Sequence, residues 1–134
     1  MPTLYAEGGN YRFDLDGGVA KCRVWRRPDV DGETGAEFAR EKVAHFEALA
    51  KGPARAMVFD LRDAPPVTGP KTQEALGQMF APFERAGRRI AVLVGPNAIQ
   101  QLQMSRLVDS TAPSQGQVFT TESEAIAFAR HERH

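Results

Sequence analysis

Alternating polar and apolar positions near the start of the chain predict two β-strands. The segments 11–15 and 19–25 each place apolar and polar side chains in turn. Successive side chains of a strand point to opposite faces, so this period of two is typical of half-buried strands. Gly17 and Gly18 lie between the two segments and accept the positive φ that tight turns require. The pattern therefore predicts an antiparallel hairpin.

Two later segments are apolar without interruption and predict strands that are covered on both faces. Residues 56–59 are Ala-Met-Val-Phe, and residues 90–94 are Ile-Ala-Val-Leu-Val. Continuous runs of this kind are typical of parallel sheets, because helices pack on both faces of such sheets. A further short strand is predicted over residues 117–120.

Helical spacing of apolar residues predicts a first helix after the hairpin. A polar loop covers residues 27–33, and Thr34 to Glu37 then has the form of a capping box. Gly52 and Pro53 end this helix.

Two shorter helices are predicted later in the chain. Asn97 caps the first of them, and Thr121 to Glu124 forms a second capping box that opens the last helix.

The second helix carries the clearest apolar stripe in the sequence. Pro70 suits its first turn, and Pro82 is expected to kink it because proline removes a backbone hydrogen bond. Three arginines are predicted to close the helix and to complement its dipole, namely Arg85, Arg88 and Arg89. Its stripe follows the spacing i, i+3, i+4, i+7 and consists of Leu76, Met79, Phe80 and Phe83.

The resulting order of elements is β-β-α-β-α-β-α-β-α. A hairpin followed by βα units predicts a mixed, mainly parallel sheet of about five strands with about four helices. Joints between the elements are short, so residues 1–134 are expected to form one domain. Ligands of such sheets bind at the carboxyl ends of the strands, which here are residues 60–69 and 95–97.

Composition narrows the functional classes. The chain has 134 residues, of which 42% are apolar, so it has enough material for a core. Its 17 basic residues equal its 17 acidic residues, and this balance argues against a nucleic-acid partner while leaving a local basic face open. Cys22 is the one cysteine and is expected to be buried and inert. A signal peptide and a membrane span are not expected, and a cytoplasmic location follows by default.

Polar groups at the expected strand ends are few. Asp60 and Asp63 flank the end of a buried strand, and Asn97 follows the next one. Carboxylates in that position serve as phosphoacceptors or metal ligands in other proteins, but such sites need further acids and a lysine that this sequence does not supply there. A loop or capping role is favoured for them. We expect no catalytic residue, no metal site and no cofactor.

Thr68 precedes the second helix and supplies the hydroxyl group of the segment 66–69. A hydroxyl at a helix start can cap the helix, or it can carry a phosphate that the free N–H groups and the dipole favour. The capping role is the preferred interpretation. Thr68 is therefore a candidate phosphoacceptor or anion site, and a purely structural role as a helix cap is the alternative.

Three stretches of the chain resemble the STAS domain and its SpoIIAA-like relatives. They are the hairpin with its following helix (11–25 onward), the strand Met57-Val58-Phe59-Asp60-Leu61, and the closing strand and acidic helix over 118–128. The resemblance implies a non-enzymatic regulatory or binding module. It also implies a phosphorylated Ser or Thr at the start of the helix after that strand, which corresponds to Thr68. The usual Asp-Ser-Ser-Gly pattern is replaced here by Pro66-Val67-Thr68-Gly69.

Two hypotheses follow, and simple observations separate them. A regulatory or protein-interaction module would use the second helix and Thr68 against a protein partner, and an exposed apolar patch would favour it. A binder of a small apolar ligand or lipid would use Leu76, Met79, Phe80 and Phe83 to line a pocket between the second helix and the sheet, although their ordinary role is core. An apolar cavity or a co-purifying lipid would favour it. An enzyme of another type would need polar groups converging in a cleft, and it is a remote alternative.

Overall fold

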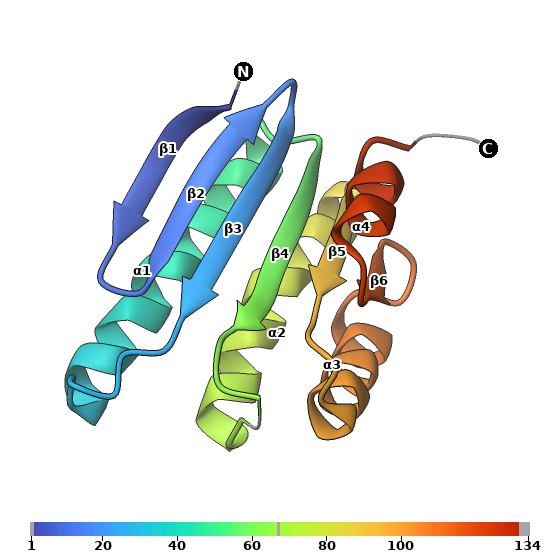
Figure 1. Ribbon diagram of the computed structural model, residues 1–134. Coiled ribbons are helices and arrows are strands. Elements are labelled where there is room, and N and C mark those ends of the chain that lie inside the picture. The colour runs from blue at the N-terminus through green and yellow to red at the C-terminus, as the bar shows by residue number, and fades with distance from the viewer. Residues whose placement is uncertain (1, 67, 132–134) are drawn as a thin grey trace.

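The computed structural model of the protein describes residues 2–66 and 68–131. These residues form six strands and four helices (Figure 1). The strands are β1 (Thr3–Gly8), β2 (Tyr11–Asp16), β3 (Val19–Trp25), β4 (Ala56–Asp63), β5 (Arg89–Leu93) and β6 (Gly116–Phe119). The helices are α1 (Gly32–Lys51), α2 (Pro70–Ala86), α3 (Ala98–Thr111) and α4 (Glu122–Ala129).

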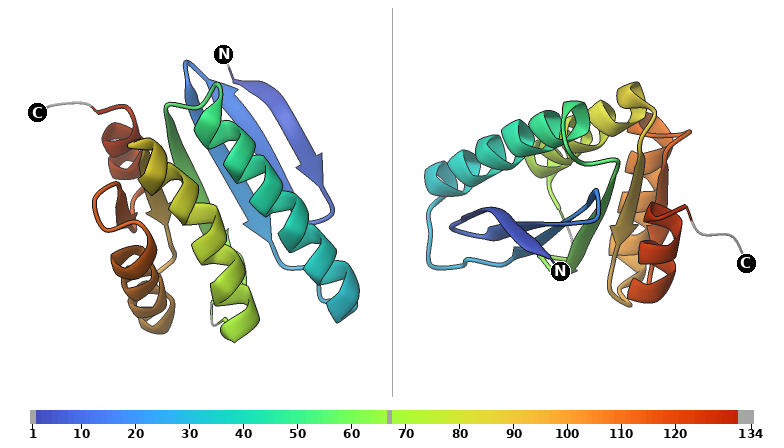
Figure 2. Two further views of the ribbon diagram at one scale, coloured as in Figure 1. Left: turned by 180° about the vertical axis from the view of Figure 1, so that it is seen from behind. Right: turned by 90° about the horizontal axis from the view of Figure 1, so that it is seen from above.

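The strands lie in one sheet in the order of the sequence, β1-β2-β3-β4-β5-β6. The first two pairings are antiparallel and the last three are parallel, which confirms the predicted mixed, mainly parallel α/β fold. Right-handed crossovers between successive neighbours place their helices on one face of a sheet. Helices α1, α2 and α3 accordingly cover one face, and α4 packs on the other (Figures 1 and 2).

The predicted hairpin is confirmed as β2 and β3. Asp16 pairs with Val19, so Gly17 and Gly18 form a two-residue loop. Both glycines have positive φ, at 59° and 87°. A type I′ turn requires that combination, and its twist matches the twist of the two strands.

Strand β1 is an addition to the five strands that the sequence predicts. It pairs antiparallel to β2, with a register shift between Leu4 and Ala6. Most of its side chains are exposed, including Leu4 at 46% and Tyr5 at 37%. A strand at the sheet edge with an irregular register does not display a clean period of two, and this explains why alternation did not reveal it.

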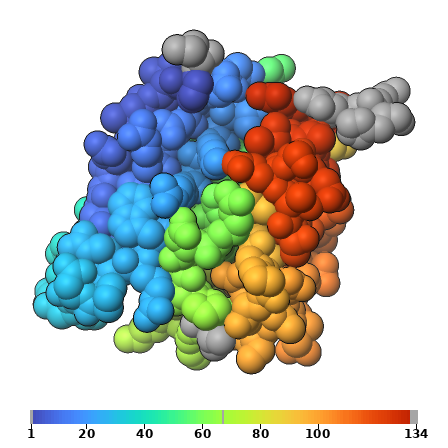
Figure 3. Space-filling model, viewed as in Figure 1, coloured from blue at the N-terminus to red at the C-terminus, as the bar shows by residue number. Residues whose placement is uncertain are grey.

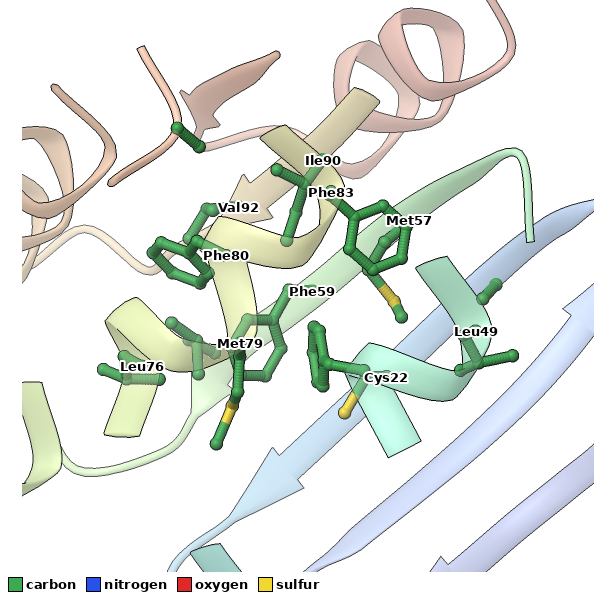
Figure 4. Packing of buried hydrophobic residues seen from close by; sticks show 14 of the residues in the cluster. Cys22, Leu49, Met57, Phe59, Leu76, Met79, Phe80, Phe83, Ile90 and Val92 are labelled. Atoms are coloured by element: carbon green, nitrogen blue, oxygen red, sulfur yellow. The ribbon is translucent and has the colours of Figure 1, made fainter. Parts of the chain in front are cut away.

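The main core lies between the sheet and helices α1–α3. Phe13, Phe46, Phe59 and Phe80 form a chain of edge-to-face rings, with successive centroid separations of 5.5, 4.9 and 5.9 Å. Aromatic pairs favour this geometry because the positive edge of one ring meets the negative face of the next. Figure 4 shows Phe80 and Phe83 reaching from α2 toward the side chains of β4 and β5. A smaller core under α4 consists of Ala56, Val58, Ala91, Leu93, Ala125 and Ala129.

The face of β1–β3 that is turned away from α1 is charged. Figure 3 shows these strands at the surface, with β1 at the far edge and β3 on the side toward α4. Side chains of opposite sign pair across the strands there, as in Arg12–Glu7 at 3.7 Å and Arg23–Asp63 at 3.0 Å. Such exposed pairs stabilise a fold by little, about 0–1 kcal/mol each.

Both predicted capping boxes are wrong in detail. Helix α1 begins at Gly32, and Asp31 accepts a hydrogen bond from the Thr34 backbone N–H at 2.7 Å. An aspartate N-cap three residues earlier therefore replaces the predicted start at Thr34. Helix α4 does begin after Thr121, but that hydroxyl donates to the Glu124 carboxylate at 2.7 Å and caps no backbone N–H.

The arginines predicted to close α2 have different positions. The helix ends at Ala86, so only Arg85 lies in its last turn. Arg88 instead donates to the carbonyls of Gly52 and Ala54, at 2.9 and 2.7 Å, and so satisfies acceptors just beyond the end of α1. Arg89 belongs to β5, and its guanidinium lies 4.6 Å from the centroid of the Phe128 ring.

Candidate functional site

Thr68 lies immediately before α2, as predicted, and is fixed to α3. Its backbone N–H and its hydroxyl both donate to the side-chain oxygen of Gln103, at 3.1 and 3.3 Å. The Gln103 amide nitrogen donates back to the Thr68 carbonyl at 3.3 Å, and Gln73 donates to that carbonyl at 3.1 Å. Amide groups of two helices therefore hold this half-buried threonine, and its side chain is not the N-cap of α2.

The N-terminus of α2 differs from those of the other helices. Its N-cap is Gly69, no side chain caps it, and its first turn contains no acidic residue. Backbone N–H groups at a helix start carry partial positive charge, so an anion at this position is stabilised. The Lys71 side chain, in the same first turn, is exposed and adds a full positive charge.

An exposed apolar patch lies on α3 close to Thr68. Ile99 is 54% exposed and Leu102 is 51% exposed. They are spaced i, i+3, and the exposed Arg106 follows at i+7, so all three share one side of the helix. We call Ile99, Leu102 and Arg106 the α3 patch. Gln103, which binds Thr68, is flanked by these residues in the sequence.

Asp60 is buried and neutralised by a neighbour on its own strand. Strand β4 extends to Asp63, so Asp60 lies within the strand and not in the predicted loop. It is 3% exposed, and its carboxylate accepts hydrogen bonds from Arg62 Nε at 3.0 Å and Nη2 at 2.8 Å. Burial opposes ionisation of Asp60, but the hydrogen bonds from Arg62 outweigh it and hold the pKa below its ordinary value.

The Asp60–Arg62 pair continues into a small network on the α4 face. Arg62 also lies 3.5 Å from the Glu122 carboxylate at the start of α4, and Glu122 pairs with Lys21 of β3. The hydrogen bond from Lys21 lowers the pKa of Glu122. These four charged side chains join β3, β4 and α4. Two are acidic and two are basic, so their charges cancel, and this balance indicates a structural role.

Asp63 and Asn97 do not converge with Asp60. Asp63 is exposed and pairs with Arg23, at 3.0 Å, across a bulge in the β3–β4 pairing. The Asn97 side chain accepts from the Gln100 backbone N–H at 2.9 Å and caps α3, as predicted. The three polar groups at the strand ends are therefore each bound to a separate local partner.

Gln100 joins the carboxyl ends of β4 and β5, a role that the sequence did not indicate. It is 5% exposed. Its side-chain oxygen accepts from the Gly95 N–H at 3.0 Å, and its amide nitrogen donates to the Leu61 carbonyl at 3.2 Å. One buried amide therefore satisfies a backbone donor and a backbone acceptor on neighbouring strand ends.

Replacing Gln100 by leucine is expected to destabilise the protein. Gln100→Leu leaves the Gly95 N–H and the Leu61 carbonyl without their partner, which costs about 2 kcal/mol of unfolding free energy. Urea unfolding followed by circular dichroism measures the change. Gln78→Leu on the exposed side of α2 is the matched control and is expected to alter the free energy by less than about 0.5 kcal/mol. Equal values for the two variants would contradict the bridging role.

The apolar stripe of α2 divides between two environments. Phe80 and Phe83 are fully buried and belong to the main core (Figure 4). Leu76 and Met79 are also buried in that core, but they lie at the edge of a hollow of about 790 Å³. This hollow is bordered by two of the four residues predicted to line a ligand pocket between α2 and the sheet, and Phe80 and Phe83 do not line it. It opens between α1 and α2, where the two helices diverge toward their N-terminal ends (Figure 2).

The groove between α1 and α2 is mainly apolar and contains one buried cation. Apolar side chains come from α1, α2, α3 and the sheet, including Phe38, Val43, Ala75, Met104 and Leu61. Lys42 also lines the groove, although only 6% of its surface is exposed. Burial lowers the pKa of Lys42 to about 8. We refer to this feature as the α1/α2 groove.

Lys42 has one hydrogen-bond acceptor among the described residues. Its ammonium donates to Asn10 Oδ1 at 3.0 Å and lies 6.0 Å from the centroid of the Tyr11 ring. The Tyr11 hydroxyl donates to the Glu41 carboxylate at 2.8 Å, and burial together with that carboxylate raises the pKa of Tyr11 to about 12. Lys42 was not among the residues that the sequence predicted to be buried or to form a site.

Two other sequence expectations concern groups away from these sites. Cys22 is fully buried, and its burial raises the pKa of the thiol, in agreement with the expectation of an inert cysteine. Within residues 2–66 and 68–131, no helix combines the length and the hydropathy that a membrane crossing demands.

Comparison with known proteins gives a fold. No protein-family model matches the chain, and no curated protein matches it. Solved structures with the same architecture include the NMR structure of the protein TM1081, with a TM-score of 0.63 and 15% identity over 96% of this chain and 94% of that chain. They also include an anti-sigma factor antagonist from Mycobacterium paratuberculosis, with a TM-score of 0.61 and 17% identity over 97% and 95% of the two chains. The protein therefore has the STAS-like, SpoIIAA-like fold that its order of elements predicted.

Proposed function

We propose that the protein is a non-enzymatic regulatory module that binds a protein partner through the start of α2 and the α3 patch. The observation that carries the proposal is the placement of Thr68. It lies at an uncapped helix start and is tied to Gln103 on the helix that exposes Ile99 and Leu102. A candidate switch residue and an apolar docking surface are thus adjacent.

The α3 patch has the composition of an interface. Ile99 and Leu102 are both more than half exposed, and burying them against a partner would release water from apolar surface. Arg106 lies beside them and is one of the residue types enriched in interfaces. Their separation from the main core means that they are not required to hold the fold together, so a binding role accounts for their exposure.

Phosphate on Thr68 would change this surface. The phosphate adds about two negative charges and removes the hydroxyl proton that Thr68 donates to Gln103. The α2 dipole and Lys71 stabilise the new charge, whereas an apolar partner surface would have to desolvate it. We therefore expect phosphorylation of Thr68 to weaken docking of a partner on the α3 patch.

The fold supports the same class of function. One structural neighbour is an anti-sigma factor antagonist, which by its name acts on another regulatory protein. A catalytic role has less support, because Asp60, Asp63 and Asn97 are each engaged by a different local partner. General acid–base chemistry needs such groups to converge on one reacting atom.

Affinity purification from the protein's own host cells tests the proposal. We expect one regulatory protein to co-purify with the wild-type chain and with Thr68→Ala, as measured by quantitative mass spectrometry. Its recovery should fall about tenfold with Thr68→Glu or Leu102→Gln, since a charge or a lost apolar anchor removes a large share of interface energy.

Leu4→Gln is the matched control for the apolar anchor. Leu4 is 46% exposed, close to the 51% of Leu102, but it lies on β1 at the opposite edge of the sheet. This variant should retain the partner at the wild-type level. An equal loss with Leu4→Gln, or full retention by Leu102→Gln, would show that the α3 patch is not the docking surface.

A further inference from the structure

We propose that the α1/α2 groove binds a long-chain fatty acid, with its carboxylate on Lys42 and its acyl chain along the apolar walls. The groove contains none of the residues of the α3 patch, although Thr68 and Lys71 at the start of α2 lie on its lining. The buried ammonium group of Lys42 is its most distinctive feature.

Lys42 is a buried cation that has no carboxylate within salt-bridge distance among the described residues, and Glu41 favours its charged form only through space. A desolvated ammonium is costly unless a counter-charge and hydrogen-bond acceptors surround it. Lys42 has three N–H donors, and Asn10 Oδ1 accepts one of them at 3.0 Å. Its 6% exposure leaves little room for water to serve the others, while its side chain borders the groove. A carboxylate bound in the groove supplies both the missing charge and the missing acceptors.

The groove as a whole favours an anion. Its lining includes five basic side chains and a single acidic one, Glu74, although the chain as a whole is neutral. The basic residues are Arg26, Arg27, Arg40, Lys42 and Lys71, and of these Arg27 is paired with Asp29 at 2.8 Å. Charges of one sign around a cleft with apolar walls concentrate the field within it and attract ligands of opposite sign. The remaining excess of positive charge therefore favours anionic ligands and disfavours cationic ones.

The walls favour an acyl chain over more polar anions. The volume of about 790 Å³ is within the range of small-molecule sites, which is roughly 300–1,000 Å³. Apolar side chains such as Val43, Leu61 and Ala75 offer no hydrogen bonds to the hydroxyls of a sugar or the amides of a peptide. An acyl chain needs none, and each CH₂ group that it buries gains from leaving water.

Oleate is the probe for this proposal, and Trp25 is the built-in reporter. Trp25 is the single tryptophan of the chain, is half-buried and lines the groove. Titration of the full chain with oleate, below its micelle concentration, should change Trp25 fluorescence in a saturable way. Native mass spectrometry of the same sample should show one oleate per chain.

Lys42→Met tests the contribution of the oleate carboxylate separately from that of the acyl chain. Methionine keeps the length and apolar stem of lysine but removes the charge, so the oleate Kd should rise by about tenfold or more. Binding of oleyl alcohol, which has the same chain and no charge, should change less than that. Lys51→Met at the exposed end of α1 removes the same charge outside the groove and should leave the oleate Kd unchanged.

Ala39→Phe is the second variant, because it fills the groove and leaves Lys42 in place. It should weaken oleate and oleyl alcohol alike, while its thermal unfolding shows that the chain is folded. Absence of a saturable oleate signal in the wild-type chain would overturn the proposal, as would wild-type oleate affinity in both Lys42→Met and Ala39→Phe. Neither result would bear on partner recovery in the Leu102→Gln experiment.

Discussion

Phe80→Ala is expected to lower the free energy of unfolding by about 3–5 kcal/mol, the range for a fully buried phenylalanine. Phe80 has no exposed surface, and its ring meets the ring of Phe59 edge to face, with centroids 5.9 Å apart. Truncation removes the transfer energy of the ring and leaves a cavity beneath α2 that the neighbouring side chains fill only in part. Urea unfolding followed by circular dichroism measures the loss.

The matched control for Phe80 is an exposed apolar residue on the adjacent helix. Leu102→Ala, at 51% exposure, should change the free energy by no more than about 0.5 kcal/mol. A loss below about 1 kcal/mol for Phe80→Ala would mean that the ring borders open space and loses few contacts on truncation. That result would indicate that the hollow beside Leu76 and Met79 extends toward Phe80, as the predicted ligand pocket requires.

The elements that the sequence predicted are those whose pattern is set locally. The hairpin follows from alternation on both sides of Gly17 and Gly18, and the parallel strands follow from unbroken apolar runs. Element starts were less well determined, because several residues near a boundary can cap a helix. Asp31 and Thr34 are both good N-caps by residue type, and only the folded chain shows that Asp31 accepts the hydrogen bond.

The groove was not predictable because it depends on how two helices diverge. Periodicity shows which side of α1 is apolar, but it does not give the angle between α1 and α2. Lys42 did leave a signal. It lies four residues before Phe46 and seven before Leu49, and these residues form the buried side of α1 together with Ala50. Val43, one residue further along, is half-buried, so the apolar pattern alone does not single out the lysine.

Asp60 illustrates the same limit for charged residues. It stands between Phe59 and Leu61 at the end of an apolar run, which places it within a buried strand. Its strand neighbour on the same face is Arg62, two positions later, and period-two spacing brings their side chains together. The sequence was interpreted instead as a loop, and a loop aspartate would have been accessible to a ligand.

Arg62→Leu is expected to destabilise the protein by about 3 kcal/mol at neutral pH, the lower end of the range for a buried carboxylate that loses its cation. Asp60 would remain 3% exposed in the folded state but would lose its two hydrogen bonds from the guanidinium. Lys21, which also lowers the pKa of Asp60, keeps the loss from being larger. Arg23→Leu is the control, because its partner Asp63 is 54% exposed and the expected loss is about 0–1 kcal/mol.

The pH dependence of the Arg62→Leu loss identifies its cause. In the wild-type chain the pKa of Asp60 lies below its ordinary value of 3.8, so the stability it contributes is present above pH 3.8 and is lost as the pH falls through the folded pKa. Without the Arg62 guanidinium, burial is opposed only by the backbone N–H of residue 62 and by Lys21, so we expect the pKa of Asp60 to rise above 3.8. The deficit of the variant should therefore be complete at neutral pH and should shrink as the pH falls through that raised pKa toward 3.8. A deficit that stays constant from pH 7 to pH 4 would instead assign the loss to packing of the Arg62 stem against the sheet.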